Sequence, residues 1–169
     1  MHLTLTAERS IAAAPEAVFA LALDHERFPA LFDGYGPIPG LKRITPLSPP
    51  ALGSLRALEN RDGSKLRERI TAWQPPHHHA YVLDGFRAPL SWLAREGQAD
   101  WRFHAEPDAD DPRIANVTHV VWTYRFELTS FLAWPLAAPL LQGCMRAAMR
   151  RCLERMAQSL ETAWREERR

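Results

Sequence analysis

The stretch GSLRALENRDGSKLRERITAW, residues 53–73, constrains the fold more than any other part of the sequence. It holds two segments of alternating polarity, separated by Arg61, Asp62 and Gly63. A three-residue loop of this kind places its glycine at the left-handed position of a type I turn followed by a bulge. The stretch therefore predicts an antiparallel hairpin.

The charges on the two segments indicate the register of this hairpin. In the register that the loop defines, Arg56 lies opposite Glu68. Leu58 lies opposite Leu66 on the same face. A shift by one residue would set Arg56 against Arg69, a pair of like charges, so the first register is preferred.

The predicted Arg56–Glu68 pair shares a face with leucines, and this has two interpretations. Burial of two charges costs several kcal/mol per ion before their attraction offsets it, so a buried pair suggests a role in orienting a polar group of a ligand. Alternatively, the pair lies half solvated at the sheet rim and contributes about 0–1 kcal/mol. The sequence leaves both interpretations open.

Three further segments alternate between apolar and polar residues with the period of a strand. One buried face and one solvent-exposed face are typical of antiparallel sheets. Residues 34–50, rich in proline and glycine, are expected to form loop or edge strand. The apolar positions of the three segments are Leu3, Leu5 and Ala7; Ala99, Trp101, Phe103 and Ala105; and Val120, Trp122, Tyr124, Phe126 and Leu128.

Helices are expected at two places. Residues 14–32 predict two short helices, broken near Asp24 and again after Phe32. The last thirty residues contain no proline and a single glycine, so they predict a long terminal helix. Apolar residues recur at three- and four-residue spacing from Ala137 to Ala163, so one face of this helix is expected to pack against the sheet.

Composition and charge limit the class of protein. The chain has 169 residues, 46% apolar and 24% charged, without repeats or linkers, so one domain spanning residues 1–169 is expected. The formal net charge of +1 argues against a nucleic-acid partner. The N-terminus lacks the form of a secretory signal, so we expect a cytoplasmic location. Cys144 and Cys152 lie about 12 Å apart along the predicted helix, too far for a disulfide.

Three segments carry a family resemblance: ERSIAAAPEAVFALALD (8–24), GSLRALENRDGSKLRERITAWQPP (53–76) with the strand around Tyr81, and VTHVVWTYRFEL (117–128). With them the chain resembles the START-like superfamily, in particular its polyketide cyclase/dehydrase and lipid-transport branch. The resemblance implies an α+β helix-grip fold, in which a curved antiparallel β-sheet of about six or seven strands wraps around a long C-terminal α-helix. Two short helices follow the first strand. These are fold motifs and include no catalytic signature.

The resemblance also implies a cavity between the sheet and the C-terminal helix that binds or carries a hydrophobic or amphipathic molecule, such as a lipid, an isoprenoid or a polyketide-like compound. A solid core would give the same periodicity. Aromatic and methionine side chains suit a site for varied apolar shapes. The predicted lining is Arg56, Leu58, Glu68, Trp101, Phe103, Trp122, Tyr124, Phe126, Leu141, Met145 and Met149.

Two other functions are compatible with the sequence. In an acid/base enzyme of the cyclase or dehydratase type, Glu68 would be the base and Arg56 would stabilise an enolate, while Tyr124 or Tyr81 would donate a proton. In a protein-interaction module, the apolar surface from Phe131 to Leu140 would bind the partner. No dinucleotide or phosphate-binding motif is present, so no cofactor is expected.

Two segments have more than one interpretation. His77, His78 and His79 suggest a metal site, but neighbours in a strand face opposite sides and no third ligand is in place, so a solvated strand start without metal is expected. The segment SFLAWPLAAPLLQG, residues 130–143, is unusually apolar. It is expected to form a pocket lid, to make transient membrane contact with Trp134 at the interface, or to be buried against the short helices or a second subunit. Monomer and homodimer remain open.

Overall fold

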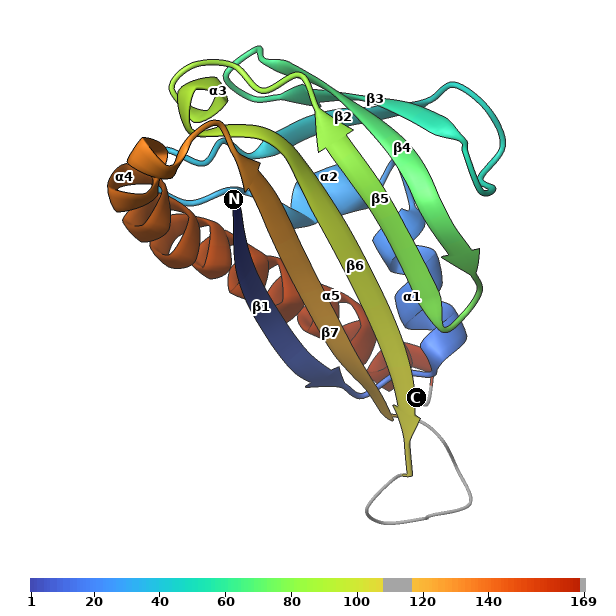
Figure 1. The fold of residues 1–169 in the computed structure, drawn as a ribbon. Helices are drawn as coiled ribbons and strands as arrows, with labels where there is room; N and C mark the ends of the chain where they lie inside the picture. Colours follow the sequence, from blue (N-terminus) through green and yellow to red (C-terminus); the bar gives the residue numbers. More distant parts are fainter. Residues whose placement is uncertain (108–116, 168–169) are drawn as a thin grey trace.

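The structure, a computed structural model, describes residues 1–107 and 117–167, with side chains up to residue 163. Seven strands form one antiparallel sheet (Figure 1). The strands are β1 (His2–Ile11), β2 (Leu41–Pro46), β3 (Leu55–Asn60), β4 (Lys65–Gln74), β5 (His78–Asp84), β6 (Ala94–Glu106) and β7 (Val117–Leu128). Their order is β1-β7-β6-β5-β4-β3-β2, so β2 is an edge strand, as predicted for residues 34–50.

The helices lie on one side of the curved sheet, and the last of them crosses its concave face (Figure 1). This arrangement confirms the predicted helix-grip fold. The short helices are α1 (Pro15–Leu23), α2 (Phe28–Leu31) and α3 (Leu90–Leu93). The C-terminal helical run consists of the 3₁₀-helix η1 (Phe131–Ala133), α4 (Trp134–Ala138), the π-helix η2 (Pro139–Met145) and α5 (Arg146–Glu167).

The C-terminal helical run differs from the single regular helix that was expected. Helical structure already begins at Phe131, within the apolar segment. From Pro139 the run widens into a π-helix, in which proline removes one backbone donor and the hydrogen-bond ladder shifts. The predicted buried face is otherwise confirmed from Ala137 to Met156, whereas Ala163 is exposed.

The hairpin of β3 and β4 has the predicted register. Arg56 pairs with Glu68 and Leu58 with Leu66. Gly63 has a φ of 80°, the left-handed conformation that the loop requires. The charge pattern and the turn glycine were therefore sufficient to determine this pairing.

The inward faces of β5, β6 and β7 build the centre of the core. Trp101 and Trp122, adjacent on β6 and β7, stack with their ring centroids 4.0 Å apart. Further along β6, Ala105 is exposed rather than covered, because the end of β6 projects beyond the helices (Figure 1). Cys144 and Cys152 are both free thiols, as expected.

Candidate functional site

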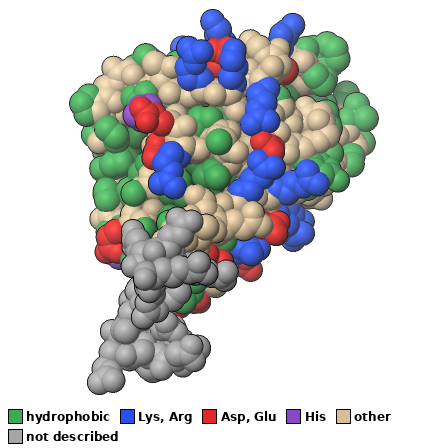
Figure 2. All heavy atoms as spheres, turned by 180° about the vertical axis from the view of Figure 1, so that it is seen from behind, with side chains coloured by type: hydrophobic (Ala, Val, Ile, Leu, Met, Phe, Trp, Pro, Cys, Tyr) green, Lys and Arg blue, Asp and Glu red, His purple; other side chains and the backbone are tan. Residues whose placement is uncertain are grey.

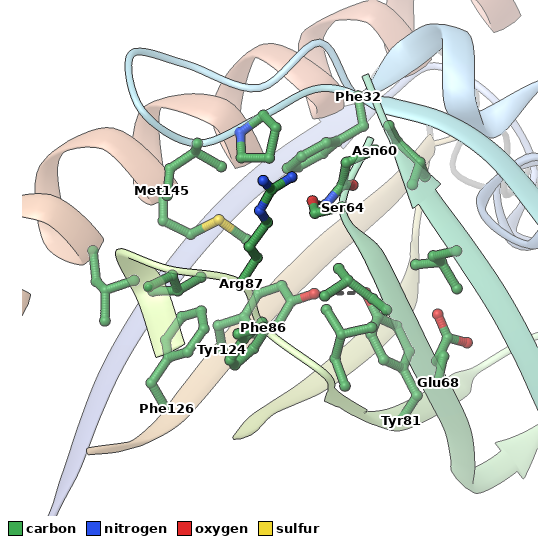
Figure 3. Close-up of a pocket in the computed structure, with 18 of the residues that line it drawn as sticks. Phe32, Asn60, Ser64, Glu68, Tyr81, Phe86, Arg87, Tyr124, Phe126 and Met145 are labelled. Carbon is green, nitrogen blue, oxygen red and sulfur yellow. Dashed lines mark hydrogen bonds between the residues drawn. The ribbon is translucent and has the colours of Figure 1, made fainter. Parts of the chain in front are cut away.

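A cavity of about 130 Å³ lies between the concave face of the sheet and the helices. Its walls come from α1 and α2, the loop between α2 and β2, the inner faces of β2 to β7, the loop after β5 with the start of α3, and η2. Most of the lining is apolar, and Figure 3 shows a part of it. Aromatic rings form the floor, because β6 and β7 turn their large side chains toward the helices.

Nine of the eleven side chains predicted to line a cavity do so. The two exceptions, Phe103 and Met149, are fully buried in the packed core. Phe103 is covered by Phe19 of α1, with ring centroids 5.3 Å apart, so the helix closes the interior at that end. The nine lining residues are Arg56, Leu58, Glu68, Trp101, Trp122, Tyr124, Phe126, Leu141 and Met145.

Arg56 and Glu68 form a buried ion pair in the cavity wall. Arg56 donates to Oε1 of Glu68 through Nε at 2.7 Å and through Nη2 at 2.5 Å. The side chain of Glu68 is only 2% exposed, so the half-solvated rim position does not apply. Burial raises the pKa of Glu68, although the positive charge of Arg56 acts in the opposite direction. A charged pair thus faces an otherwise apolar space.

Tyr81 and Tyr124 form a second polar pair, with their hydroxyl oxygens 3.0 Å apart (Figure 3). Both side chains are buried on neighbouring inner faces of the sheet. Burial raises the pKa of each tyrosine, so both hydroxyls keep their protons near neutral pH. Because only one proton lies between the two oxygens, the other hydroxyl proton is left for a ligand acceptor.

His79 differs from the solvated strand start that was expected. His77 is exposed, but His79 is 2% exposed and lies among the rings of Phe19, Trp73 and Tyr81. Burial, with a smaller contribution from the charge of Arg56, lowers the pKa of His79 to about 3. Within the described residues, neither ring nitrogen of His79 has a hydrogen-bond partner.

The position of His79 could have been found in the sequence. It lies two residues before Tyr81, so strand alternation puts both side chains on one face. Side chains on that face line the cavity. Nowhere in the described ranges do three His, Cys, Asp or Glu side chains gather as a metal ion would require.

The mouth of the cavity contains polar residues that the sequence analysis did not identify. Asn60 and Ser64, at the two ends of the β3–β4 turn, are buried and joined by a hydrogen bond of 2.9 Å. Arg87 reaches toward them from the loop after β5 (Figure 3). This loop has neither strand nor helix periodicity, so no pattern marked its residues as lining.

An apolar patch lies beside the cavity and consists of Trp92, Phe131, Leu132, Trp134 and Leu136 on α3, η1 and α4. The exposed fractions of these side chains range from 41% to 71%, so they are not buried against the two short helices. Figure 2 shows hydrophobic side chains gathered on the right, at the end of the molecule that carries α4. No helix in the described part of the chain combines the length and the apolar character needed to cross a bilayer.

Comparisons with known proteins agree with this architecture. Residues 2–161 match the model of a family described as polyketide cyclase/dehydrase and lipid transport. The aromatase/cyclase Zhui from Streptomyces sp. R1128 has a similar fold, with a TM-score of 0.70, 13% identity, and coverage of 95% of this chain and 94% of that one. No curated protein matches the sequence.

Two further solved structures share the fold. The protein TTHA0849 from Thermus thermophilus has a TM-score of 0.67 and 20% identity, covering 95% of this chain and 99% of that one. Norcoclaurine synthase from Thalictrum flavum, solved with dopamine and hydroxybenzaldehyde, has a TM-score of 0.64 and 10% identity, covering 94% and 88%. At these identities the likeness concerns the fold alone.

Proposed function

This chain belongs to the polyketide cyclase/dehydrase and lipid transport family, and on that premise we propose that it binds or carries a hydrophobic or amphipathic small molecule in its cavity. The observation that carries the proposal is an apolar cavity bordered by two buried polar pairs. Its volume is on the order of that of an engineered cavity of about 150 Å³ that holds benzene. An aromatic ring or a short alkyl chain is therefore the part of a lipid, isoprenoid or polyketide-like ligand that this volume accommodates.

The two polar pairs give such a ligand an orientation. A ligand oxygen can accept the free tyrosine proton of the Tyr81–Tyr124 pair, while Arg56 and Glu68 favour a polar group over a methyl group nearby. An apolar pocket with a small number of polar groups is typical of ligand sites. The hydrogen bonds fix the orientation of the ligand, and burial of its apolar surface provides the affinity.

Native mass spectrometry of the freshly purified protein, followed by solvent extraction, tests the proposal. We expect a stoichiometric apolar adduct in the wild type and its loss in Leu58→Trp, which fills the cavity from β3. Ala57→Trp, on the outer face of the same strand, is the matched control and should keep the adduct. If no adduct is found and no apolar probe binds saturably, the proposal is contradicted.

An acid/base enzyme of the cyclase or dehydratase type is the second candidate. It is supported by the raised pKa of Glu68 beside the two tyrosine hydroxyls. In this function Glu68 accepts a proton from an enolisable ligand, Arg56 stabilises the enolate, and Tyr124 returns a proton. With the extracted ligand as substrate, Glu68→Gln would abolish turnover and leave affinity nearly unchanged. Glu59→Gln would alter neither, because Glu59 is paired with Lys42 and does not line the cavity.

We also propose transient membrane contact through the apolar patch. Leu90 and Leu140, which line the cavity, lie within or next to the helices that carry the patch. These two leucines connect the patch with the cavity lining, so a lipid could pass from a bilayer into the cavity along them. Trp92 and Trp134 are of the residue type that favours the membrane interface.

A further inference from the structure

Arg87 is a cation at the mouth of the cavity. It belongs to the loop between β5 and α3, and its neighbour Phe86 also lines the cavity. Its guanidinium lies across the mouth, on the side of Phe32, Asn60 and Ser64 (Figure 3). In the described ranges, no hydrogen bond or ion pair is formed by the Arg87 side chain.

The other charged groups of the cavity are already engaged. Arg56 is paired with Glu68. Asp62 accepts two hydrogen bonds at Oδ1, from the backbone N–H of Ser64 at 2.9 Å and from its hydroxyl at 2.6 Å. These bonds lower the pKa of Asp62, with a smaller effect from the charge of Arg87, and in the described part of the chain the two side chains form no ion pair. Arg87 is thus the lining cation whose donors remain open.

Asn60 adds a second donor at the same end. It is buried, and its Nδ2 donates one hydrogen to Ser64 Oγ at 2.9 Å. An amide nitrogen carries two hydrogens, so one remains. A guanidinium fork and an amide donor at the rim of an apolar space together match an oxyanion attached to an apolar body.

We propose that the ligand carries an oxyanion, a carboxylate or a phosphate, that is bound by Arg87 at the mouth while its apolar part lies in the cavity. This inference rests on the proposed function and adds the charge of the ligand to it. The anionic group stays near solvent, where its hydration is retained, and only the apolar part is desolvated.

Matched probes of equal shape test the role of charge. Calorimetry would compare benzoate with the neutral benzamide, and hexanoate with hexanamide, for wild type, Arg87→Gln and Arg125→Gln. Arg125 lies on the outer face of β7, between two inward residues, and is the control. We expect the anions to bind about tenfold more tightly than the amides to the wild type and to Arg125→Gln, but equally to Arg87→Gln. Phenyl phosphate then shows whether the site prefers phosphate to carboxylate.

The outcomes separate this inference from the function on which it rests. If acids and amides bind equally to wild type, or if Arg87→Gln keeps the preference, Arg87 does not recognise an anion and the inference is overturned, while the cavity function stands. If none of the probes binds, both are contradicted. Arg87→Lys should keep part of the preference, since the charge remains and the planar fork is lost, and about 0.5 M salt should reduce it.

Discussion

Arg56 and Glu68 are expected to be strongly coupled, because both lie in the cavity wall and Arg56 donates twice to one oxygen. Removing one partner leaves an uncompensated buried charge, which costs about 3–5 kcal/mol of unfolding free energy. Replacing both, with Arg56→Met and Glu68→Leu, should cost clearly less than the sum of the single changes. Urea unfolding of the three variants measures the coupling, and a value of zero would show that the side chains do not meet.

His79 is expected to make the protein less stable in mild acid. Its pKa is near 3 in the folded state and about 6.5 when unfolded, so the unfolded chain binds the extra proton. Stability from this group is therefore complete above pH 6.5 and is lost as the pH falls toward 3. Between pH 7.5 and pH 5 the loss amounts to about 2 kcal/mol.

The control for His79 is His79→Phe, measured by urea unfolding over the same pH range. Glu68 contributes with the opposite sign, since a carboxyl whose pKa is raised by folding favours the folded state as it becomes protonated. Only the difference between wild type and variant therefore reports on the histidine. An identical pH dependence in both proteins would assign the titration to other groups.

At the level of single residues, the sequence predicted what periodicity can express. Alternation placed Tyr124 and Trp122 on the inner face, and the turn geometry paired Arg56 with Glu68. It could not identify Arg87, because the direction of a loop side chain depends on how the loop packs against Phe32 and the β3–β4 turn. The open hydrogen-bond donors at the cavity mouth can therefore be identified only from the folded structure.

Among the elements, the hairpin was predictable in detail and the C-terminal helical run only in outline. Opposed charges and the turn glycine act within about twenty residues, so local sequence was sufficient for β3 and β4. Whether a helix tolerates Pro135 and Pro139 depends on tertiary contacts that satisfy the released backbone groups. Those contacts come from distant parts of the chain.

The apolar patch is expected to bind lipid bilayers through α4 and its neighbours. Leu132→Glu combined with Leu136→Glu should weaken sedimentation with phosphatidylcholine vesicles at least about tenfold, since a fully buried leucine is worth about 1.5–3 kcal/mol. Leu52→Glu is a matched control, because Leu52 is also 71% exposed but lies in the loop between β2 and β3.

Several results would redirect this interpretation of the patch. Equal vesicle binding by all three proteins would remove the patch from membrane contact. If the double variant instead loses a dimer that the wild type forms, the patch is an interface between two copies. If Trp134→Ser loses a captured protein partner while vesicle binding and dimer formation are unchanged, the patch belongs to an interaction module.

For the whole molecule, ligand occupancy is expected to control thermal stability. A ligand that binds only the folded state adds about 2.7 kcal/mol at a hundred times its dissociation constant. Solvent-extracted and refolded protein should therefore melt at a lower temperature than protein carrying its adduct, and adding the extract should restore the Tm. Leu58→Trp should show no such difference, whereas a ligand-independent Tm in the wild type would argue for an unoccupied interior.

At the same scale, the sequence could predict which faces are buried but not that a cavity remains between them. Trp101, Trp122 and Phe126 would show the same alternation in a solid core. The empty volume depends on the distance of α2 and η2 from the sheet, and the packed volumes of many side chains together determine that distance. Small differences in that sum decide between a filled interior and a binding site.

The pairing of β1 with β7 has a consequence for biosynthesis. All other neighbouring strands are consecutive in the chain, so they can associate as the chain leaves the ribosome. In β1, Leu3 and Leu5 have no partners in the sheet until Tyr124 and Phe126 of β7 have been translated. During that interval its apolar residues are available to chaperones or to other nascent chains. Ribosome pausing before β7 would therefore leave β1, which is translated before the other strands of this sheet, unpaired for longest.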